Sequence, residues 1–344
     1  MNYRVQWLQT QQSFDVGADE SVLDAATRQG VALPHECTFG GCGTCRMKVE
    51  AGAFAYADGE LPLAMSEEEH AQGYALACQA RAQSDLVISI AAGPDSSAPI
   101  RVQATVAELR MHTPDIYHLA LDLPEDHGLR YVPGQYLNIC LPGGEHRSFS
   151  MATPPQGRRI SLQIRKIAGG RFTDGLLATM AVGDVLDVEL PHGSFYYRAQ
   201  DYQPMVFAAT GTGFAPIKAI LESLLGDADC PPIHFYWGMR SEADLYLLDE
   251  IAAWAGQLYE FTFVPVLSRP SDRWTGRRGY VQDAIAEDFE DLSEHSIYLC
   301  GSPHMIADAK ALMALSGAAL DKIYSDSFIF QNEAAAVAEL SEQN

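Results

Sequence analysis

Hydrophobic and polar positions alternate in short runs over the first 90 residues, which predicts a small module of mixed α and β structure. The segment Ser21–Arg28 has an apolar face of helical spacing, with Ser21 available as its N-cap and Gly30 just beyond its end. A second short helix is expected after Ser66, because Ser66 and Glu69 form a capping-box pattern. Strands are expected near residues 3–9, 12–16, 46–50 and 86–90.

The pattern changes near residue 100. The segment 91–99 is small and polar and contains two prolines, which is the composition of a linker. Longer alternating runs follow it and predict a region of β-strands. The clearest of these runs are 101–109, 117–123, 136–141 and 160–167.

A second change occurs near Pro204. Met205–Ala209 is an unbroken apolar run, as expected of a buried parallel strand. Strand-like and helix-like segments then alternate, which predicts an α/β domain. Strands are expected at 233–238, 260–267, 297–300 and from 322 onward, and helices in 216–225, 243–255, 279–288 and 305–315.

Length and composition limit the classes of function. A chain of 344 residues with 47% hydrophobic residues suits two or three globular domains. The formal net charge of −22 argues against nucleic acid or an anionic membrane as a partner. Residues 1–95 carry 13 acidic against 5 basic side chains, which fits either a solvated face or a docking surface. No apolar run is long enough to span a membrane, and the N-terminus does not have the pattern of a signal peptide.

The cysteines carry the most specific pattern in the chain. Cys37, Cys42 and Cys45 follow a C-x4-C-x2-C spacing, and Cys78 comes 32 residues later. This is the ligand spacing of a plant-type [2Fe–2S] cluster. A zinc site is the alternative, although four-cysteine zinc sites usually contain two C-x2-C pairs and only one is present here. The chain has seven cysteines, an odd number that is not densely spaced, which argues against a disulfide framework. Cysteines outside disulfides predict a cytoplasmic protein.

Two further segments carry residues suited to a flavin nucleotide. Arg147 can bind a phosphate, Phe149 can stack on a planar ring, and Ser150 lies on the opposite strand face. Such a triplet is also common at an ordinary strand edge. Gly170 and Thr173 follow in a glycine-rich segment, where Thr173 is a candidate cap for a short helix and backbone N–H groups could meet a pyrophosphate.

The α/β region contains two turns that suit a dinucleotide. The sequence Gly211-Thr212-Gly213 comes after a strand and before a helix, so a pyrophosphate could approach its backbone. Pro216 occupies the last position of the expected glycine motif, and a plain tight turn is the alternative. Cys300-Gly301 follows another strand at the end where ligands of α/β sheets bind, although Cys300 could equally be a small buried residue.

The order of these motifs resembles that of a known protein family. Residues 1–92 resemble a plant-type ferredoxin with a β-grasp α+β fold, and 93–99 is a linker. Residues 100–200 resemble the FAD-binding antiparallel β-barrel of the ferredoxin–NADP reductase superfamily. Residues 201–330 resemble its α/β parallel-sheet NAD(P)H-binding domain, and 331–344 form a C-terminal tail. The chain as a whole resembles the reductase component of bacterial aromatic-ring oxygenases, of the benzoate dioxygenase and phenol hydroxylase types.

This resemblance implies a role for each motif. The ligands of the cluster are then Cys37, Cys42, Cys45 and Cys78. FAD is bound by Arg147, Phe149, Ser150, Gly170, Thr173 and Phe328, with core packing as the alternative for Phe328. NADH is bound by Gly211, Thr212, Gly213, Pro216, Cys300 and Gly301, with Ser150 and Cys300 nearest to the reacting rings.

The implied activity is electron transfer from NADH through FAD and the [2Fe–2S] cluster to a separate terminal oxygenase. A 2′-phosphate needs a cation, and Arg240 is a candidate for it. NADH is nevertheless expected rather than NADPH because the acids Glu242 and Asp244 lie beside Arg240. The protein is expected to be monomeric on its own. Two alternatives keep the electron path but change its acceptor, namely a diiron monooxygenase or an enzyme of deoxysugar synthesis. A third, from another class, is a redox-sensing protein without turnover.

Overall fold

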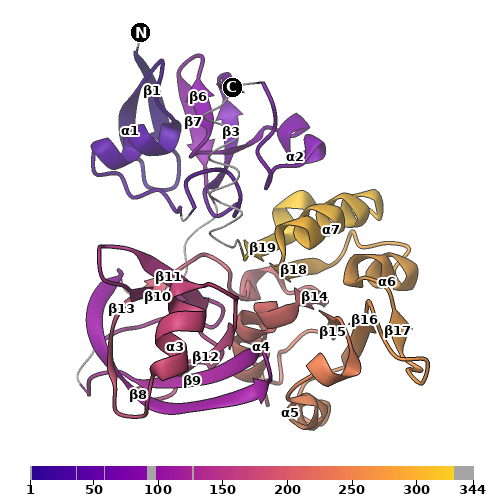
Figure 1. Ribbon diagram of the computed structural model, residues 1–344. Coiled ribbons are helices and arrows are strands. Elements are labelled where there is room, and N and C mark those ends of the chain that lie inside the picture. The colour runs from indigo at the N-terminus through magenta and orange to yellow at the C-terminus, as the bar shows by residue number, and fades with distance from the viewer. Residues whose placement is uncertain (1, 36, 58, 91–97, 126–127, 329–344) are drawn as a thin grey trace. The chain divides into compact units, whose positions relative to one another are not determined.

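A computed structural model describes residues 2–35, 37–57, 59–90, 98–125 and 128–328 (Figure 1). The chain forms two compact units. The first contains residues 1–93, 302–315 and 325–344, and the second contains 94–301 and 316–324. The predicted tail at 331–344 lies outside the described residues.

The first unit is organised around a five-stranded sheet of order β2-β1-β7-β3-β5. β1 pairs antiparallel with β2 and parallel with β7, and β3 lies antiparallel to both β7 and β5. A separate antiparallel pair, β4 and β6, completes its β structure in the described residues. The strands are β1 Asn2–Trp7, β2 Ser13–Gly17, β3 Arg46–Ala51, β4 Phe54–Tyr56, β5 Tyr74–Leu76, β6 Ala80–Ala82 and β7 Leu86–Ser89.

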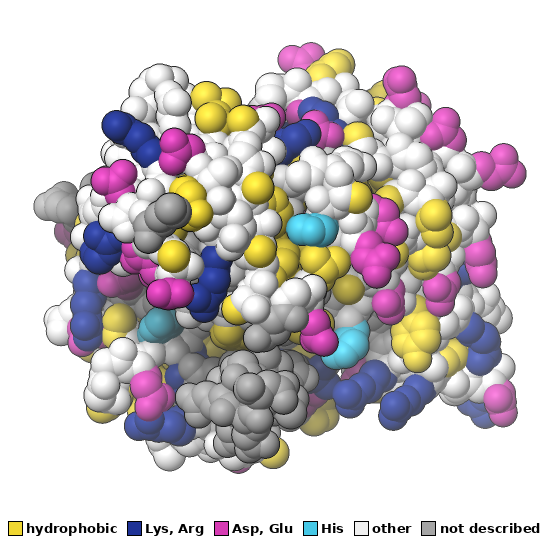
Figure 2. Space-filling view, turned by 90° about the horizontal axis from the view of Figure 1, so that it is seen from above, with side chains coloured by type: hydrophobic (Ala, Val, Ile, Leu, Met, Phe, Trp, Pro, Cys, Tyr) yellow, Lys and Arg dark blue, Asp and Glu magenta, His cyan; other side chains and the backbone are white. Residues whose placement is uncertain are grey.

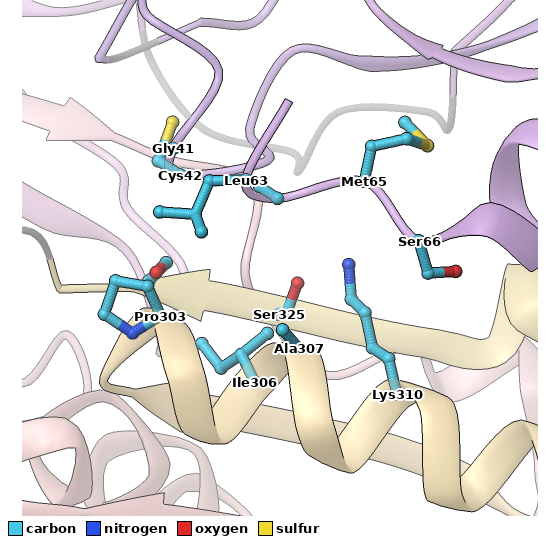
Figure 3. A pocket seen from close by; sticks show the side chains of 12 residues that line it. Gly41, Cys42, Leu63, Met65, Ser66, Pro303, Ile306, Ala307, Lys310 and Ser325 are labelled. Carbon is cyan, nitrogen blue, oxygen red and sulfur yellow. The ribbon is translucent and has the colours of Figure 1, made fainter. Parts of the chain in front are cut away.

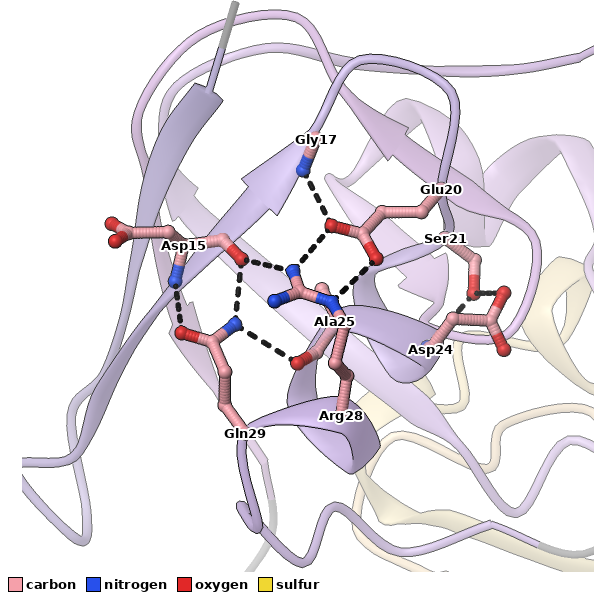
Figure 4. A network of polar contacts seen from close by, with 8 residues as sticks. All are labelled: Asp15, Gly17, Glu20, Ser21, Asp24, Ala25, Arg28 and Gln29. Carbon is pink, nitrogen blue, oxygen red and sulfur yellow. Dashed lines mark hydrogen bonds and ion pairs between the residues drawn. The ribbon is translucent and has the colours of Figure 1, made fainter.

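Helix α1, Val22–Arg28, is fixed by contacts at both of its ends (Figure 4). The Ser21 hydroxyl accepts a hydrogen bond from the Asp24 N–H, as its predicted N-cap role requires. At the other end Arg28 pairs with Glu20 at 2.6 Å and donates to the Asp15 carbonyl. The apolar face of the helix is buried, so sequence pattern, capping and packing agree.

Two more helices belong to the first unit. α2, Glu67–Ala71, has the predicted capping box: the Ser66 hydroxyl accepts from the Glu69 N–H, and the Glu69 carboxylate accepts from the Ser66 N–H. α7, Pro303–Leu315, comes from the C-terminal part of the sequence.

The second unit begins with a six-stranded antiparallel sheet of order β11-β10-β13-β8-β9-β12. Met151, next to β11, bridges Leu162 of β12, so the two outer strands meet and the sheet closes into a barrel. The inward side chains form one buried apolar cluster. The strands are β8 Ile100–Thr113, β9 Ile116–Asp122, β10 Tyr136–Cys140, β11 His146–Ser150, β12 Arg159–Arg165 and β13 Val185–His192, and the helical turns are η1 Arg171–Leu176, α3 Leu177–Thr179 and η2 Ala199–Asp201.

A second six-stranded sheet has the order β17-β16-β15-β14-β18-β19. β14, β15, β16 and β18 are parallel where they pair, which is the predicted α/β arrangement. Its strands are β14 Met205–Thr210, β15 Ile233–Met239, β16 Phe261–Leu267, β17 Arg277–Arg278, β18 Ser296–Gly301 and β19 Ile323–Ser327. Its helices are η3 Gly211–Gly213, α4 Phe214–Ser223, η4 Glu242–Asp244, α5 Leu248–Trp254, α6 Val281–Asp288 and η5 Leu320–Lys322.

Buried polar contacts join the barrel to the parallel sheet within the second unit. The Tyr246 hydroxyl donates to Gln163 Oε1 of β12 at 2.7 Å, and both residues are buried. The Arg198 N–H donates to the Tyr298 hydroxyl of β18 at 2.9 Å. Because a buried hydroxyl or amide is costly without its partner, these bonds favour one relative placement of barrel and sheet.

Two local predictions were wrong. The helix expected over 243–255 is interrupted at Leu247, whose φ is +59°, because Tyr246 turns inward to reach Gln163. Thr173 does not cap a helix: the short π-helix η1 has Gly170 at its N-cap and Thr173 inside it. No helix in the described part of the chain has the length and apolarity to cross a membrane.

Candidate functional site

The four predicted cluster ligands lie together as two pairs of sulfur atoms. The Cys45 and Cys78 Sγ atoms are 3.2 Å apart. Cys37 Sγ accepts backbone hydrogen bonds from Gly41 and Cys42, both at 3.3 Å. Cys42, Cys45 and Cys78 are buried, and Cys37 is half-buried. The fold thus brings together four sulfur atoms whose residues are up to 41 positions apart in the sequence.

The protonation of these thiols reflects their mutual contact. Hydrogen bonding from the Cys42 thiol is the main reason that the pKa of Cys37 falls to about 6. The same contact and burial raise the pKa of Cys42, and contact with Cys45 raises that of Cys78. Backbone N–H groups directed at sulfur favour thiolate, the form that binds metal. The sulfurs therefore suit a cationic centre.

Paired sulfurs fit a two-iron cluster better than a single zinc ion. A [2Fe–2S] cluster takes two protein ligands on each iron, whereas structural zinc takes four around one centre. In the described residues, no three or more His, Cys, Asp or Glu side chains are arranged to hold one metal ion. Gly40, at φ +82°, allows the loop its tight path, since a Cβ there would lie 2.7 Å from Pro62.

The predicted FAD residues come from β11 and from the π-helix η1. Arg147 pairs with Glu145 at 3.3 Å, and Arg171, the first residue of η1, pairs with the same carboxylate. Sequence reasoning missed Arg171. Two guanidinium groups around one acid form a place where a phosphate could replace the carboxylate, since both anions accept the same donors.

An aromatic contact brings β11 and η1 together. The rings of Phe149 and Phe172 lie 5.3 Å apart, with Phe172 in the barrel core and Phe149 half-buried against it. Ser150 is buried at the end of β11. The Thr173 hydroxyl bonds the Ile167 backbone, accepting at 3.1 Å and donating at 3.2 Å. Thr173 thus stabilises the loop that leads to Gly170.

The two predicted nucleotide turns touch each other. A Cβ at Gly213 would lie 2.3 Å from the Cys300 carbonyl oxygen, so the glycine loop and the β18 end approach through their backbones. A Cβ at Gly301, where φ is +142°, would lie 2.1 Å from the Thr210 hydroxyl. Only glycine fits at either position. The arrangement leaves backbone groups close together at the carboxyl ends of β14 and β18, where dinucleotides bind such sheets.

The remaining predicted nucleotide residues lie on the glycine loop, on the helix after it and in β18. Thr212 is half-buried in η3, while Pro216 is in the first turn of α4 and Cys300 is buried. Trp237 of β15, which sequence reasoning missed, donates from Nε1 to the Gly211 carbonyl at 3.0 Å. This bond holds the glycine loop at its first residue, where φ is +57°.

Phe328 follows β19 and is half-buried. Two residues earlier, Asp326 is buried, and burial raises its pKa to about 7. A carboxyl group that can keep its proton near neutral pH is common at functional sites, and the sequence pattern did not single it out.

Charged side chains of both signs are spread over the face of the protein that is drawn in Figure 2. Figure 2 shows acidic side chains distributed over the visible face with Lys and Arg among them. A formal charge of −22 is therefore compatible with a solvated surface on that face.

Comparison with known families matches three consecutive segments. Residues 5–83 match the 2Fe-2S iron-sulfur cluster binding domain, 103–197 the oxidoreductase FAD-binding domain, and 207–311 the oxidoreductase NAD-binding domain. The phenol hydroxylase P5 protein of Acinetobacter pittii is 34% identical, over 98% of this chain and 97% of its own length.

The chain belongs to this family of oxygenase reductases. Reductase component 2 of terephthalate 1,2-dioxygenase from a Comamonas species is 33% identical, over 95% of this chain and 98% of its own. The CDP-6-deoxy-L-threo-D-glycero-4-hexulose-3-dehydrase reductase of Yersinia pestis is 33% identical over 92% and 95%. Among solved structures, the Amycolatopsis cytochrome P450 reductase GcoB has a TM-score of 0.70 and 32% identity, covering 95% of this chain and 98% of its own.

Membership of the oxygenase-reductase family confirms the predicted fold class and cofactors. The protein is a multidomain oxidoreductase with a [2Fe–2S] ferredoxin-type domain, a FAD-binding barrel and an NAD-binding α/β domain, using the cluster, FAD and NADH. It is an electron-transfer reductase.

Proposed function

We propose that this reductase takes electrons from NADH and delivers them singly to a separate terminal oxygenase. The observation that carries the proposal is the contact between the Gly213 and Cys300 backbones, in a chain that also gathers four thiols into two pairs. When bound, the nicotinamide supplies a hydride, the flavin divides its two electrons, and the cluster carries them one at a time. The domain limits predicted from the sequence, 1–92, 100–200 and 201–330, are part of the same proposal.

The cluster would be held by Cys37 and Cys42 on one iron and by Cys45 and Cys78 on the other. The Gly41 and Cys42 N–H groups stabilise negative charge on the Cys37 sulfur. Such backbone bonds are a means of tuning a cluster's reduction potential.

FAD would be held by the barrel. Arg147 and Arg171 offer paired donors to its phosphates once they leave Glu145. Phe149 is fixed by Phe172 where a planar ring can lie against it. Gly170, Ser150 and Phe328 are proposed contacts of the same group, and Thr173 acts by holding the loop.

NADH would bind at the paired turns of the parallel sheet, with Gly211, Thr212 and Gly213 at the pyrophosphate and Cys300-Gly301 near the nicotinamide. The preference for NADH over NADPH is attributed to Glu242. Its carboxylate accepts from the Ser271 hydroxyl at 2.5 Å and from the Ser271 N–H at 3.1 Å. This holds a negative charge between the ends of β15 and β16, which would repel a 2′-phosphate.

An anaerobic NADH titration followed by visible and EPR spectra tests the proposal. Flavin bleaching followed by a reduced-cluster EPR signal is expected, together with a kcat/KM for NADH at least about tenfold above that for NADPH. Glu242→Gln should narrow that ratio, whereas Glu287→Gln, which changes an exposed acid on α6, should not. A cluster that stays oxidised while the flavin is reduced would contradict the electron path.

The identity of the protein that accepts the electrons separates two candidate functions. The 33% identity to the Yersinia reductase favours an acceptor in deoxysugar synthesis as the second candidate. The test is NADH-driven turnover with purified acceptors of both classes: a Rieske oxygenase, a diiron hydroxylase and a sugar dehydrase. Support of oxygenase turnover alone would establish the first function, and support of the dehydrase alone would establish the second.

A cytoplasmic location and a monomeric state are proposed with the function. In the described residues the cysteines form no disulfide, as in proteins of a reducing compartment. Sedimentation of the cofactor-loaded protein would measure its mass against the 37.6 kDa of one chain.

A further inference from the structure

A buried ion pair joins two distant segments of the first unit. Glu69 of α2 is fully buried, and Lys310 of α7 is 4% exposed. The Lys310 Nζ lies 3.2 Å from Glu69 Oε1. The two residues are 241 positions apart in sequence. Such a pair is costly to bury, so it is stable only when geometry and additional hydrogen bonds compensate.

Those additional bonds lead to the cysteine loop. Arg46 Nη1 lies 2.5 Å from the same Glu69 oxygen, and Arg46 directly follows Cys45 in sequence. The second carboxylate oxygen accepts from the Ser66 N–H at 3.0 Å, which completes the capping box of α2. One carboxylate therefore connects α7, the start of α2 and the residue next to a proposed cluster ligand.

The charges of this network favour the ionised carboxylate. Burial alone would raise the pKa of Glu69, but Lys310 and Arg46 outweigh it and hold that pKa below the ordinary value. Burial lowers the pKa of Lys310 against the opposing effect of Glu69. Removal of Glu69 would leave an uncompensated buried charge on Lys310, whereas removal of Lys310 would leave Glu69 with Arg46 as its partner.

A small cavity lies beside the ion pair. It has a volume of about 40 Å³ and is lined on one side by Gly41, Cys42 and Met65, and on the other by Ile306 of α7 (Figure 3). Figure 3 shows Lys310 extending from α7 toward the Met65–Ser66 segment. Packing is incomplete at this cavity, and the ion pair beside it is a specific contact between α7 and α2.

We propose that Lys310 is a positioning residue for the cluster: through Glu69 it holds the Cys42–Cys45 loop against α7 in one geometry. Nothing in the family matches assigns this role. The inference rests on the proposed function only in taking the four thiols as cluster ligands.

The test compares Lys310→Met and Glu69→Gln with Lys218→Met. Lys218 is also a buried lysine with carboxylate partners, Glu222 at 2.5 Å and Glu250 at 2.8 Å, but it belongs to the second unit. In stopped-flow mixing with NADH, we expect flavin reduction to be unchanged in all three variants. Cluster reduction should be slower by about tenfold or more in Lys310→Met and Glu69→Gln, and unchanged in Lys218→Met.

Two readouts separate positioning from a plain charge effect. Positioning predicts that both variants slow cluster reduction and broaden the EPR signal of the dithionite-reduced cluster. A charge effect predicts opposite shifts of midpoint potential and rate, because one variant removes a positive and the other a negative charge. Opposite changes of rate, or wild-type rates and EPR lines in both variants, would overturn the proposal.

A further measurement is independent of catalysis. Thermal unfolding of the cofactor-loaded protein in a Glu69/Lys310 double-mutant cycle should give non-additive effects, because the two residues share one contact. Additive effects would overturn the proposal. Failure of the proposed function would instead appear in the wild type, as a cluster that dithionite reduces and NADH does not.

Discussion

The cysteine loop and the nucleotide turns use opposite means to make a site. The loop and the separate turn at Cys78 present side chains, four thiols in two pairs, on a backbone with little regular structure. The nucleotide turns depend on missing side chains, because a Cβ at Gly213 or Gly301 would collide with backbone or with a hydroxyl. The cysteine site is therefore sensitive to the loss of side-chain atoms, and the nucleotide turns are sensitive to added side-chain atoms.

This difference affects what each site tolerates. A thiolate ligand has no substitute of equal softness among common side chains, so we expect each of the four proposed ligands to be essential to the cluster. A backbone site is formed by strand ends that many contacts hold in place. A substitution nearby should therefore change the geometry of the site only in part. The flavin site lies between these cases, since it combines two arginines with a short helix.

The largest effect is expected from Cys78→Ala. Loss of one of four ligands should abolish the visible and EPR signals of the cluster and lower one-electron delivery to a protein acceptor by about a hundredfold or more, while flavin reduction by NADH continues. Iron and sulfide analysis with acceptor kinetics measures this. Cys140→Ala, at a half-buried cysteine of β10, is the matched control and should keep two irons per chain. A Cys78→Ala protein with two irons would refute the ligand assignment.

Arg147→Ala comes next. Loss of a charge-assisted contact to phosphate should weaken FAD binding by about ten- to a hundredfold, equivalent to about 1.5–3 kcal/mol. Fluorescence titration of the apoprotein with FAD gives the affinity. Arg159→Ala removes an arginine that is paired with Asp122 at 2.8 Å elsewhere on the barrel, and it should leave the affinity unchanged. Equal losses in both variants would indicate a general effect on barrel stability.

A smaller effect is expected from Gly213→Ala. The added Cβ must displace the Cys300 carbonyl, which should raise KM for NADH by about tenfold and lower stability by about 1–3 kcal/mol. Steady-state kinetics and denaturant unfolding measure the two quantities. Gly256→Ala is the control because a Cβ there meets no atom within 4 Å. Unchanged KM and stability in Gly213→Ala would show that the two turns can separate freely.

The smallest effect concerns the dependence of stability on pH. Burial, with Arg110 and His118, lowers the pKa of His112 from 6.5 to about 4. The unfolded chain then binds the extra proton between these values, so the free energy of unfolding should fall as pH drops from 6.5 toward 4. His112→Phe keeps the stacking on Tyr246, at 4.9 Å, and should lessen the fall between pH 7 and 5 by about 1–2 kcal/mol. Parallel pH profiles for both proteins would exclude this role.

Features that depend on residue identity or on local pattern could be predicted from the sequence. The cysteine spacing indicated a cluster because ligand identity is written directly in the residues, and regular apolar runs indicated the strands of the parallel sheet. The capping box at Ser66–Glu69 was predicted because its hydrogen bonds are local.

Long-range contacts could not be predicted in this way. Nothing in the neighbourhood of Lys310 indicates that it meets Glu69, and Trp237 is indistinguishable from any other buried strand residue until the Gly211 loop folds over it. The helix expected over 243–255 failed for the same reason, since Tyr246 is drawn inward by Gln163 of another sheet. Tertiary contacts outweighed local propensity in each case.

Strand β17 has a consequence for the behaviour of the protein at high concentration. It is an outer strand of the parallel sheet, only two residues long, and both residues are arginines. Arg277 is paired with Glu287 and Asp288 of α6. An outer strand that is short and charged offers few free backbone groups to a neighbouring molecule, and so protects the sheet from adding strands of another copy. Lengthening β17 with apolar residues would make the reductase prone to aggregate, although neither cofactor site would be altered.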